Sequence, residues 1–269
     1  MIRLVVSNQR GGVAKTTTAV TLARCFADRK LRTLLIDTDS QGSVATILGL
    51  KPEFTLHDFL IKQVLLTECI VQAHEGLDVL CSDRKTQSAE DIISGQTLRE
   101  LHFEQVFGDS GADRGYDAVV IDVAPSLTLF QTCAMLYTKT VLIPVAMETL
   151  SVQGASASIS SANELNRLFK RATGIVSIGM LPVMVNNRLQ MTQTVLNALH
   201  DMSAELRVPL LPMIRTDTTV AKAARSKQFI RDYDPKSKAL EDYETAADVL
   251  LTALKSGVKN GNTNIQATA

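Results

Sequence analysis

Short apolar, β-branched segments alternate along the chain with longer segments in which apolar residues recur every three or four positions. The short segments predict buried strands and the longer ones predict amphipathic helices. We expect strands at residues 2–7, 33–37, 77–81, 118–122, 140–145 and 178–185, with 208–211 as a seventh. We expect helices at residues 16–28, 86–106, 126–137, 152–171, 191–206 and 237–254.

This alternation of strands and helices is typical of βαβ units. The expected fold is α/β, with a doubly wound, mainly parallel β-sheet that carries helices on both faces. The 269 residues are enough for one large α/β domain, which we place at residues 1–256. Residues 257–269 are polar, and we expect them to form a disordered tail.

Composition limits the class of protein but does not identify a binding partner. The chain has 28 Lys and Arg against 28 Asp and Glu, so its formal net charge is zero. Its four cysteines are far apart and form no C-x-x-C pair, which fits a reducing cytoplasm and argues against a zinc site or a disulfide framework. No apolar stretch approaches the roughly 20 residues that a membrane-spanning helix needs.

A glycine-containing loop follows the first predicted strand and leads into a predicted helix. It reads Asn8-Gln9-Arg10-Gly11-Gly12-Val13-Ala14-Lys15-Thr16-Thr17-Thr18. Glycines let backbone N–H groups converge on phosphate oxygens, while the helix N-terminus and a lysine add positive charge. We therefore expect residues Gly11, Gly12, Val13, Ala14, Lys15, Thr16 and Thr17 to bind nucleotide phosphates. Gln9 and Ala14 occupy the glycine positions of G-x-x-x-x-G-K-[ST], so a simple glycine turn before a helix is the alternative.

Two further predicted strands end in aspartates. Asp37-Thr38-Asp39-Ser40-Gln41-Gly42 follows one, and Asp122-Val123-Ala124-Pro125-Ser126 follows another. Ligands of doubly wound sheets bind beyond the carboxyl ends of the strands, so these loops are expected to meet the phosphate loop in one crevice. Thr16 and Asp122 are then placed to hold the Mg²⁺ of a bound nucleotide. A buried structural aspartate is the alternative for Asp122.

Taken in order, these motifs resemble the ParA/MinD branch of the deviant Walker A ATPases, and within it the ParA/Soj-type DNA partition proteins. The family loop K-G-G-x-x-K-[ST] matches residues 10–16, D-x-D-P-Q-G matches 37–42, and hydrophobic-D-x-x-P-S matches 121–126. A V-L-I-P-V-like strand at 141–145 and E-x-x-S-x-x-G at 148–154 follow. Tyr233-Asp234-Pro235 before the last helix extends the resemblance over nearly the whole chain.

The resemblance implies an ATP-dependent homodimer that hydrolyses ATP slowly and uses Mg²⁺. It further implies non-specific DNA binding in the ATP form, release when a ParB-like adaptor stimulates hydrolysis, and a place on the nucleoid. Lys15 would contact the β- and γ-phosphates and Thr16 the metal. Asp39 would orient the attacking water, Asp37 would support the metal region, and Asp122 would be the Walker B carboxylate.

The chain departs from the family pattern at two positions. Arg10 replaces the lysine that reaches across the dimer to the partner's phosphates, and Ser40 replaces the proline of D-x-D-P-Q. Arginine keeps the charge and adds a planar fork that grips two oxygens, so we expect Arg10 to keep a catalytic contact across the dimer. Serine removes the φ restraint of proline, which loosens this loop.

Adenine recognition is expected from two segments. Asn186 or Asn187 could donate to the base at the end of the strand at 178–185, although asparagines that cap a turn are an equal alternative. Met213-Ile214-Arg215 is similar to an I-P-R stretch of the family, without its proline, and makes Arg215 a second candidate for the base.

Basic residues gather in the second half of the chain. Residues 160–238 contain 12 Lys and Arg against 6 Asp and Glu, a local excess of six positive charges. Such a cluster predicts salt-dependent contacts with DNA phosphates, with a solvated charged face as the alternative. The candidate DNA-binding residues are Arg188, Arg215, Lys222, Arg225, Lys227 and Arg231.

Other functions that occur among proteins similar to this family remain as alternatives. The C-terminal tail lacks the apolar face of a membrane-docking helix, so no membrane partner is expected. A related ATPase that positions a protein cargo on the nucleoid is one alternative function. A nucleotide-gated DNA-binding or regulatory protein with little turnover is another. An iron–sulfur relative is disfavoured, because Cys133 has no evident companion cysteine.

Overall fold

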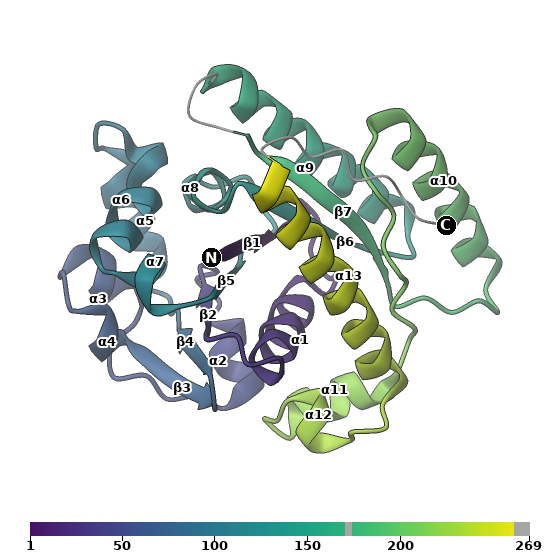
Figure 1. Ribbon diagram of the computed structural model, residues 1–269, viewed down its shortest axis with the longest axis horizontal. Coiled ribbons are helices and arrows are strands. Elements are labelled where there is room, and N and C mark those ends of the chain that lie inside the picture. Colours follow the sequence, from purple (N-terminus) through teal and green to yellow (C-terminus); the bar gives the residue numbers. More distant parts are fainter. Residues whose placement is uncertain (170–173, 261–269) are drawn as a thin grey trace.

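A single seven-stranded sheet forms the centre of the computed structural model, which describes residues 1–169 and 174–260 (Figure 1). The strands lie in the order β3-β4-β2-β5-β1-β6-β7. Their bounds are β1 Ile2–Val6, β2 Thr33–Asp37, β3 Ile70–His74, β4 Leu77–Leu80, β5 Ala118–Asp122, β6 Thr140–Ala146 and β7 Val176–Val183. All neighbours pair in parallel except β3 and β4, so the expected doubly wound, mainly parallel sheet is confirmed.

One predicted strand was wrong and one strand was missed. Residues 208–211 contribute only an isolated bridge between Leu210 and Met180, because Pro209 cannot donate a ladder hydrogen bond. The missed strand is β3, which joins β4 through the turn at Glu75 and Gly76, where Gly76 has a φ of 75°. Its mixed sequence, Ile-Val-Gln-Ala-His, carries too weak a pattern to be predicted.

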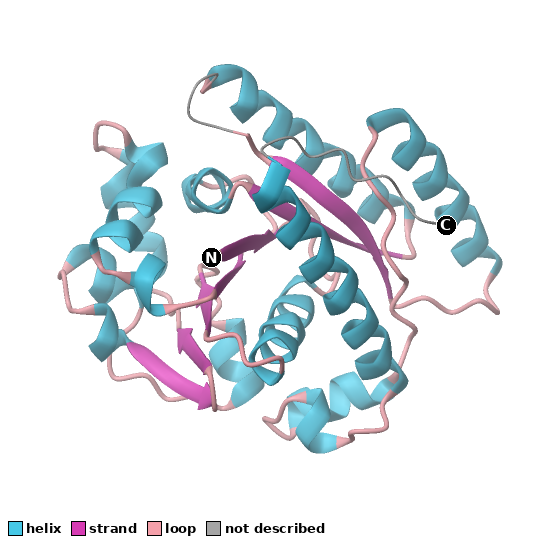
Figure 2. Cartoon of the chain, in the orientation of Figure 1, coloured by secondary structure: helices cyan, strands magenta, loops and turns pink. Residues whose placement is uncertain are grey.

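Helices surround the sheet, as Figure 2 shows. The longer ones are α1 Lys15–Asp28, α5 Thr86–Ser94, α6 His102–Asp109, α8 Leu129–Thr138, α9 Thr149–Leu168, α10 Gln190–Leu206, α11 Thr218–Arg225 and α13 Lys238–Asn260. The short ones are α2 Ser43–Leu48, α3 Leu56–Ile61, α4 Leu66–Cys69, α7 Ala112–Gly115, α12 Ile230–Tyr233 and the 3₁₀ turn η1 Arg99–Leu101. The helix predicted at 86–106 is therefore broken, because α5 ends at Ser94 with Gly95 as its C-cap, and Leu98 takes a φ of 57°.

The two faces of the sheet are covered by different helices. Alternate residues of one strand face opposite ways, so Leu4 packs with α1, α2 and α13, whereas Val5 packs with α3, α5, α6, α8 and α9. Figure 1 shows α1 and α13 side by side on the first face. These two cores hold the loops at the carboxyl ends of the strands in place.

The C-terminal boundary differs from the expectation. Helix α13 continues to Asn260, so residues 257–260 are helical rather than part of a disordered tail. The remainder of the predicted tail, 261–269, lies outside the described residues. Within the described part of the chain, none of the helices is long and apolar enough to cross a membrane.

Candidate nucleotide site

The phosphate loop lies between β1 and α1, with its glycines facing open space. Gly11 and Gly12 are exposed, and a Cβ atom at either position would meet no other atom within 4 Å. Gly12 has a φ of 77°, and Ala14 has a φ of 57°, the left-handed conformation that glycine adopts without cost. The loop therefore keeps a glycine-like backbone at Ala14, where the ordinary Walker pattern has its second glycine.

The Lys15 side chain is folded back onto this loop. Its Nζ donates to the backbone carbonyl of Asn8 at 3.1 Å and to that of Arg10 at 2.7 Å. Lys15 is only 7% exposed, and burial lowers its pKa, an effect opposed by the nearby charges of Asp122 and Asp39. Among the described residues of this loop, Lys15 is the buried cation. Its ammonium group bonds two backbone carbonyls and lies near the carboxylates of Asp122 and Asp39.

Asp37 and Asp122 end two neighbouring strands and lie side by side at the same edge of the sheet. They are register partners of β2 and β5, and Asp122 is also the partner of Val6 at the end of β1. The three loops therefore meet at one edge, as expected from the sequence. Both aspartates are fully buried, and burial raises the pKa of each.

The two carboxylates differ in their partners. Asp37 accepts hydrogen bonds from the backbone N–H of Asp39 at 3.0 Å and of Val44 at 3.1 Å. Neither oxygen of Asp122 has a well-formed hydrogen bond among the described residues. Burial raises the pKa of Asp122 to about 7, against the lowering effect of the neighbouring Thr16 hydroxyl and of the Lys15 charge. A buried carboxylate without partners is costly, and a divalent cation would satisfy it. Asp122 and the adjacent Thr16 therefore fit a Mg²⁺ site, and Asp37 mainly fixes the backbone.

The loop that carries Asp39 is half-buried at the same edge. Asp39 Oδ1 accepts the backbone N–H of Gln41 at 3.0 Å, and the Asp39 carbonyl accepts the N–H of Gly42 at 2.9 Å. Together with the bond from Asp39 N–H to Asp37, these contacts hold the loop as a compact turn. The Asp39 carboxylate is thereby kept near Lys15 and Asp122, close enough to raise the pKa of the lysine.

Helix α9 packs against the phosphate loop, a contact that was not predicted from the sequence. Asn8 Nδ2 donates to the carbonyls of Pro144 at 2.8 Å and Ser151 at 3.2 Å. A Cβ atom on Gly154 would lie 2.2 Å from Asn8 Oδ1 and 2.9 Å from Arg10 Cβ. Only glycine fits at this crossing, which is the physical reason for the last residue of the E-x-x-S-x-x-G segment.

Gln9 completes this contact with α9. Its backbone N–H donates to Ser158 Oγ at 3.1 Å, and its side chain donates to Ser161 Oγ at 2.9 Å. Arg10, the next residue, has an exposed side chain that makes no ion pair within the described residues. The loop backbone is therefore anchored on one side, while the Arg10 guanidinium is directed away from the core.

The two segments predicted to read adenine lie side by side. The backbone of Val185 pairs with Ile214 and Thr216, which brings the residues after β7 next to Arg215. Asn186 Oδ1 accepts the backbone N–H of Arg188, so its carbonyl caps a turn and its amide N–H groups remain the candidate donors. Asn187 is exposed.

Arg215 itself is held by acidic side chains of α13. Its guanidinium donates to Asp242 at 2.7 Å and to Glu241 at 2.8 Å, and its backbone N–H donates to Asp242 at 2.8 Å. These bonds raise its pKa further. The charge of Arg215 is thus matched within the chain, which weakens its candidacy for both the base and DNA.

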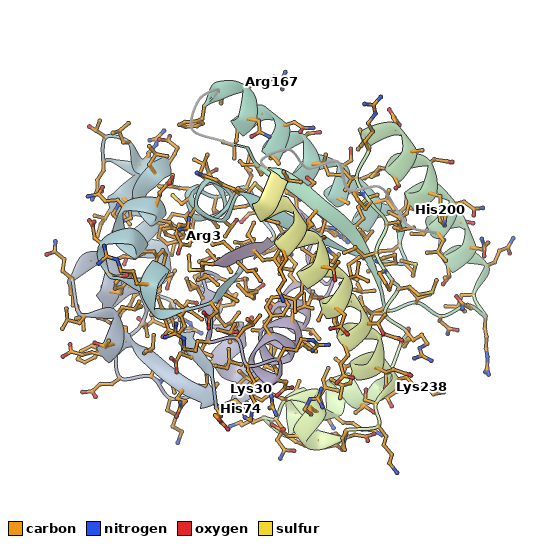
Figure 3. The ribbon with its side chains drawn as sticks, in the orientation of Figure 1. Arg3, Lys30, His74, Arg167, His200 and Lys238 are labelled. Atoms are coloured by element: carbon orange, nitrogen blue, oxygen red, sulfur yellow. The ribbon has the colours of Figure 1, made fainter. Side chains whose placement is uncertain are left out.

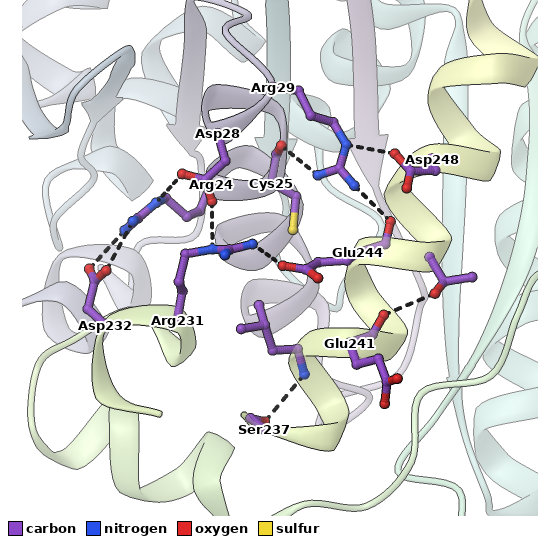
Figure 4. A network of polar contacts seen from close by, with 12 residues as sticks. Arg24, Cys25, Asp28, Arg29, Arg231, Asp232, Ser237, Glu241, Glu244 and Asp248 are labelled. Atoms are coloured by element: carbon purple, nitrogen blue, oxygen red, sulfur yellow. Dashed lines mark hydrogen bonds and ion pairs between the residues drawn. The ribbon is translucent and has the colours of Figure 1, made fainter. Parts of the chain in front are cut away.

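Arg231 also lies in a network of ion pairs rather than on a free surface. Figure 4 shows it between α1 and α13, where it pairs with Asp28 and Glu244. Next to it, Arg24 of α1 donates to both oxygens of Asp232 at 2.8 and 3.0 Å. This network ties α12 to α1 and neutralises the Arg231 charge.

The other candidate DNA residues remain available. Arg188, Lys222, Arg225 and Lys227 are exposed, and none of them forms an ion pair in the described part of the chain. Three of them belong to α11 and the turn that follows it. Lys238, which begins α13, lies at the end of that helix next to α11 (Figure 3). Three of the four exposed candidates therefore lie on α11 or directly after it.

Fold and site together define a P-loop nucleotide-binding α/β protein. A family model described as an AAA domain matches residues 1–174, and the chain belongs to this family, the ParA/MinD-like P-loop ATPases. The sporulation initiation inhibitor protein Soj of Bacillus subtilis is 27% identical over 246 residues, covering 89% of this chain and 94% of Soj.

Solved structures agree with this fold. Cobyrinic acid a,c-diamide synthase from Mycobacterium smegmatis, with bound ADP and magnesium, has a TM-score of 0.79 at 25% identity, with all of both chains covered. The structure of apo McdA from Cyanothece has a TM-score of 0.81 at 18% identity, covering 93% of this chain and 99% of that one, and shows the fold alone.

Proposed function

We propose that the chain binds ATP with Mg²⁺ at this edge of the sheet and hydrolyses it slowly. The observation that carries this proposal is the Asp122 carboxylate, buried and without a hydrogen-bond partner, opposite Lys15 and an open glycine loop. The bound ADP and magnesium of the similar synthase structure support the same assignment.

Each residue of the site has a separate role in phosphoryl transfer. Backbone N–H groups of residues 11–17 bind the phosphates, and Lys15 exchanges its two carbonyl partners for phosphate oxygens. Thr16 and Asp122 would hold Mg²⁺, which would neutralise charge on the phosphates. Asp39 orients the attacking water, so catalysis consists mostly of positioning and charge stabilisation.

We further propose that ATP brings two copies of the chain together, with Arg10 reaching the partner's phosphates. Support comes from its exposed guanidinium and the fixed backbone on either side of it. Arg10→Ala is expected to weaken ATP-dependent dimerisation at least tenfold, because a charge-assisted contact is lost. Sedimentation velocity with an ATP analogue measures the effect, and dimerisation equal to that of the wild type would refute the role of Arg10.

The ATP form is proposed to bind DNA without sequence preference through the charges around α11. Replacing Lys222, Arg225 and Lys227 by alanine should lower DNA affinity at least tenfold. The slope of log affinity against log salt should fall by about 0.9 for each phosphate contact that is lost. Fluorescence anisotropy at several salt concentrations, with two unrelated duplex sequences, measures both quantities.

Two controls test whether a loss of DNA affinity comes from the α11 surface itself, from a lower total positive charge, or from a less stable fold. One variant removes three cations from the α3–α7 region, namely Lys62, Arg99 and Arg114. It should bind DNA within about twofold of the wild type. Arg231→Ala should instead lower the free energy of unfolding, because it removes the ion pairs that join α12 to Asp28 of α1 and to Glu244 of α13. Equal losses of DNA affinity in both triple variants would contradict the assignment to α11.

The biological role we propose is plasmid or chromosome partition with a ParB-like adaptor that stimulates hydrolysis, on the nucleoid. The similarity to Soj along most of both chains supports this role. Purified chain, DNA and ATP should give slow turnover that a cognate adaptor increases. Absence of turnover in the presence of both DNA and adaptor would favour a nucleotide-gated regulatory DNA-binding protein instead.

A further inference from the structure

The segment that joins β4 to α5 touches the loop that carries Asp39. Ser82 follows β4, is 3% exposed, and its hydroxyl donates to the backbone carbonyl of Asp39. The Ser82 carbonyl packs against Gly42 on the other side of this loop, where a Cβ atom would lie only 3.0 Å away. Since Gly42 has a φ of 60°, the loop can turn there and lie flat against Ser82.

The same segment also reaches the loop that follows Asp122. Glu90 of α5 is 9% exposed, and its Oε1 accepts the backbone N–H of Phe130 at 2.9 Å. This N–H belongs to the first turn of α8, where helices leave backbone donors unsatisfied. The next residue, Gln131, donates to Ser7 Oγ at 2.7 Å, at the end of β1. Glu90 thus fixes the point at which the Asp122 loop ends.

The β4–α5 connection is itself well held. Asp83 Oδ1 accepts the N–H of Lys85 at 2.9 Å, and the Asp83 carbonyl accepts the N–H of Thr86 at 2.9 Å. Ser82 and Glu90 therefore sit on one rigid unit, at its start and in its helix. Any shift of α5 would move the Asp39 loop and the Asp122 loop together.

We propose that the β4–α5 segment sets the distance between the water-orienting Asp39 and the metal-binding Asp122, with Ser82 and Glu90 as its positioning residues. This inference rests on the proposed ATP hydrolysis. Neither residue belongs to the phosphate loop, and their partners are the Asp39 carbonyl and the Phe130 N–H. Their loss should therefore change the alignment of the two loops and leave the phosphate loop as it is. Turnover should suffer, and affinity for ATP should be nearly unchanged.

The test combines amide hydrogen exchange of the nucleotide-free chain with kinetics. In Ser82→Ala, peptides that cover residues 38–43 should exchange about three- to tenfold faster. In Glu90→Ala the same is expected for residues 123–131, as for the loss of one buried hydrogen bond. ATP turnover should fall about three- to tenfold in both variants, with ATP affinity within twofold of the wild type. Glu90→Gln, which keeps an acceptor for Phe130 N–H, should restore both values.

Matched controls lie on the same helix. Gln87→Ala and Asp91→Ala remove exposed side chains of α5 and should match the wild type in exchange and turnover. Unchanged exchange in folded Ser82→Ala and Glu90→Ala would overturn the proposal, as would a parallel loss of turnover and ATP affinity, or no rescue by Glu90→Gln. If the wild type hydrolyses no ATP, the proposed function fails, whereas the exchange data still decide whether the segment positions the two loops.

Discussion

Gly154→Ala is expected to lower the affinity for ATP at least tenfold while the chain still folds. The added methyl group would lie 2.2 Å from Asn8 Oδ1 and 2.9 Å from Arg10 Cβ, so either α9 or the phosphate loop has to move. Overpacking of this kind costs about 1–3 kcal/mol, and the loop is the less densely packed side. Its phosphate-binding N–H groups would then no longer converge.

Isothermal titration calorimetry with a non-hydrolysable ATP analogue measures this loss, and circular dichroism shows whether the variant is folded. Gly108→Ala is the matched control, because Gly108 also lies in a helix and a Cβ atom there meets nothing within 4 Å. That variant should bind ATP as the wild type does. Wild-type affinity in folded Gly154→Ala would show that the contact between α9 and the loop does not position the phosphate site.

Asp122→Asn should have opposite effects on stability and on nucleotide binding. Burial raises the pKa of Asp122, and at alkaline pH its ionised carboxylate is a buried charge without a well-formed hydrogen bond among the described residues. The amide removes this charge, so the free energy of unfolding of the nucleotide-free chain should rise by about 1–2 kcal/mol. The affinity for ATP in the presence of Mg²⁺ should fall at least tenfold, because an amide oxygen is a weaker ligand for Mg²⁺ than a carboxylate.

Urea unfolding at pH 8 and calorimetry with and without Mg²⁺ measure these two effects on the same protein. Asp91→Asn, an exposed neighbour on α5, should change neither. A variant that loses stability would show that Asp122 is a structural aspartate with a favourable environment, the alternative that its sequence left open. Unchanged Mg²⁺ dependence would remove Asp122 from the metal site.

Sequence patterns predicted that the three loops of the candidate site meet, because each loop follows the end of a strand. β1, β2 and β5 are mainly apolar, and parallel pairing brings their carboxyl ends together at one edge of the sheet. The loops with Lys15, Asp39 and Asp122 were therefore predicted to meet, and they do. The two wrong predictions of strands concern segments with weak local patterns. The edge strand β3 was missed, and residues 208–211 were predicted as a strand although Pro209 limits pairing there.

Contacts between segments far apart in sequence could not be predicted. Arg215 and Arg231 appeared as part of a basic cluster, yet Asp242 and Glu244 of α13 neutralise them. In the same way, nothing local marks Ser82 as a partner of the Asp39 loop. Charge counts along a chain report composition, whereas availability to DNA depends on which acidic side chains the fold brings near.

The most direct test of the central claim is DNA binding measured with ATP, with ADP and without nucleotide, for the wild type and Asp39→Ala. The account predicts DNA binding by the wild type only with ATP, with affinity that falls steeply as salt rises. Asp39→Ala should bind DNA with ATP and hydrolyse almost none of it, because the water is no longer oriented. DNA binding that is the same in all three nucleotide conditions, or normal hydrolysis by Asp39→Ala, would contradict the account.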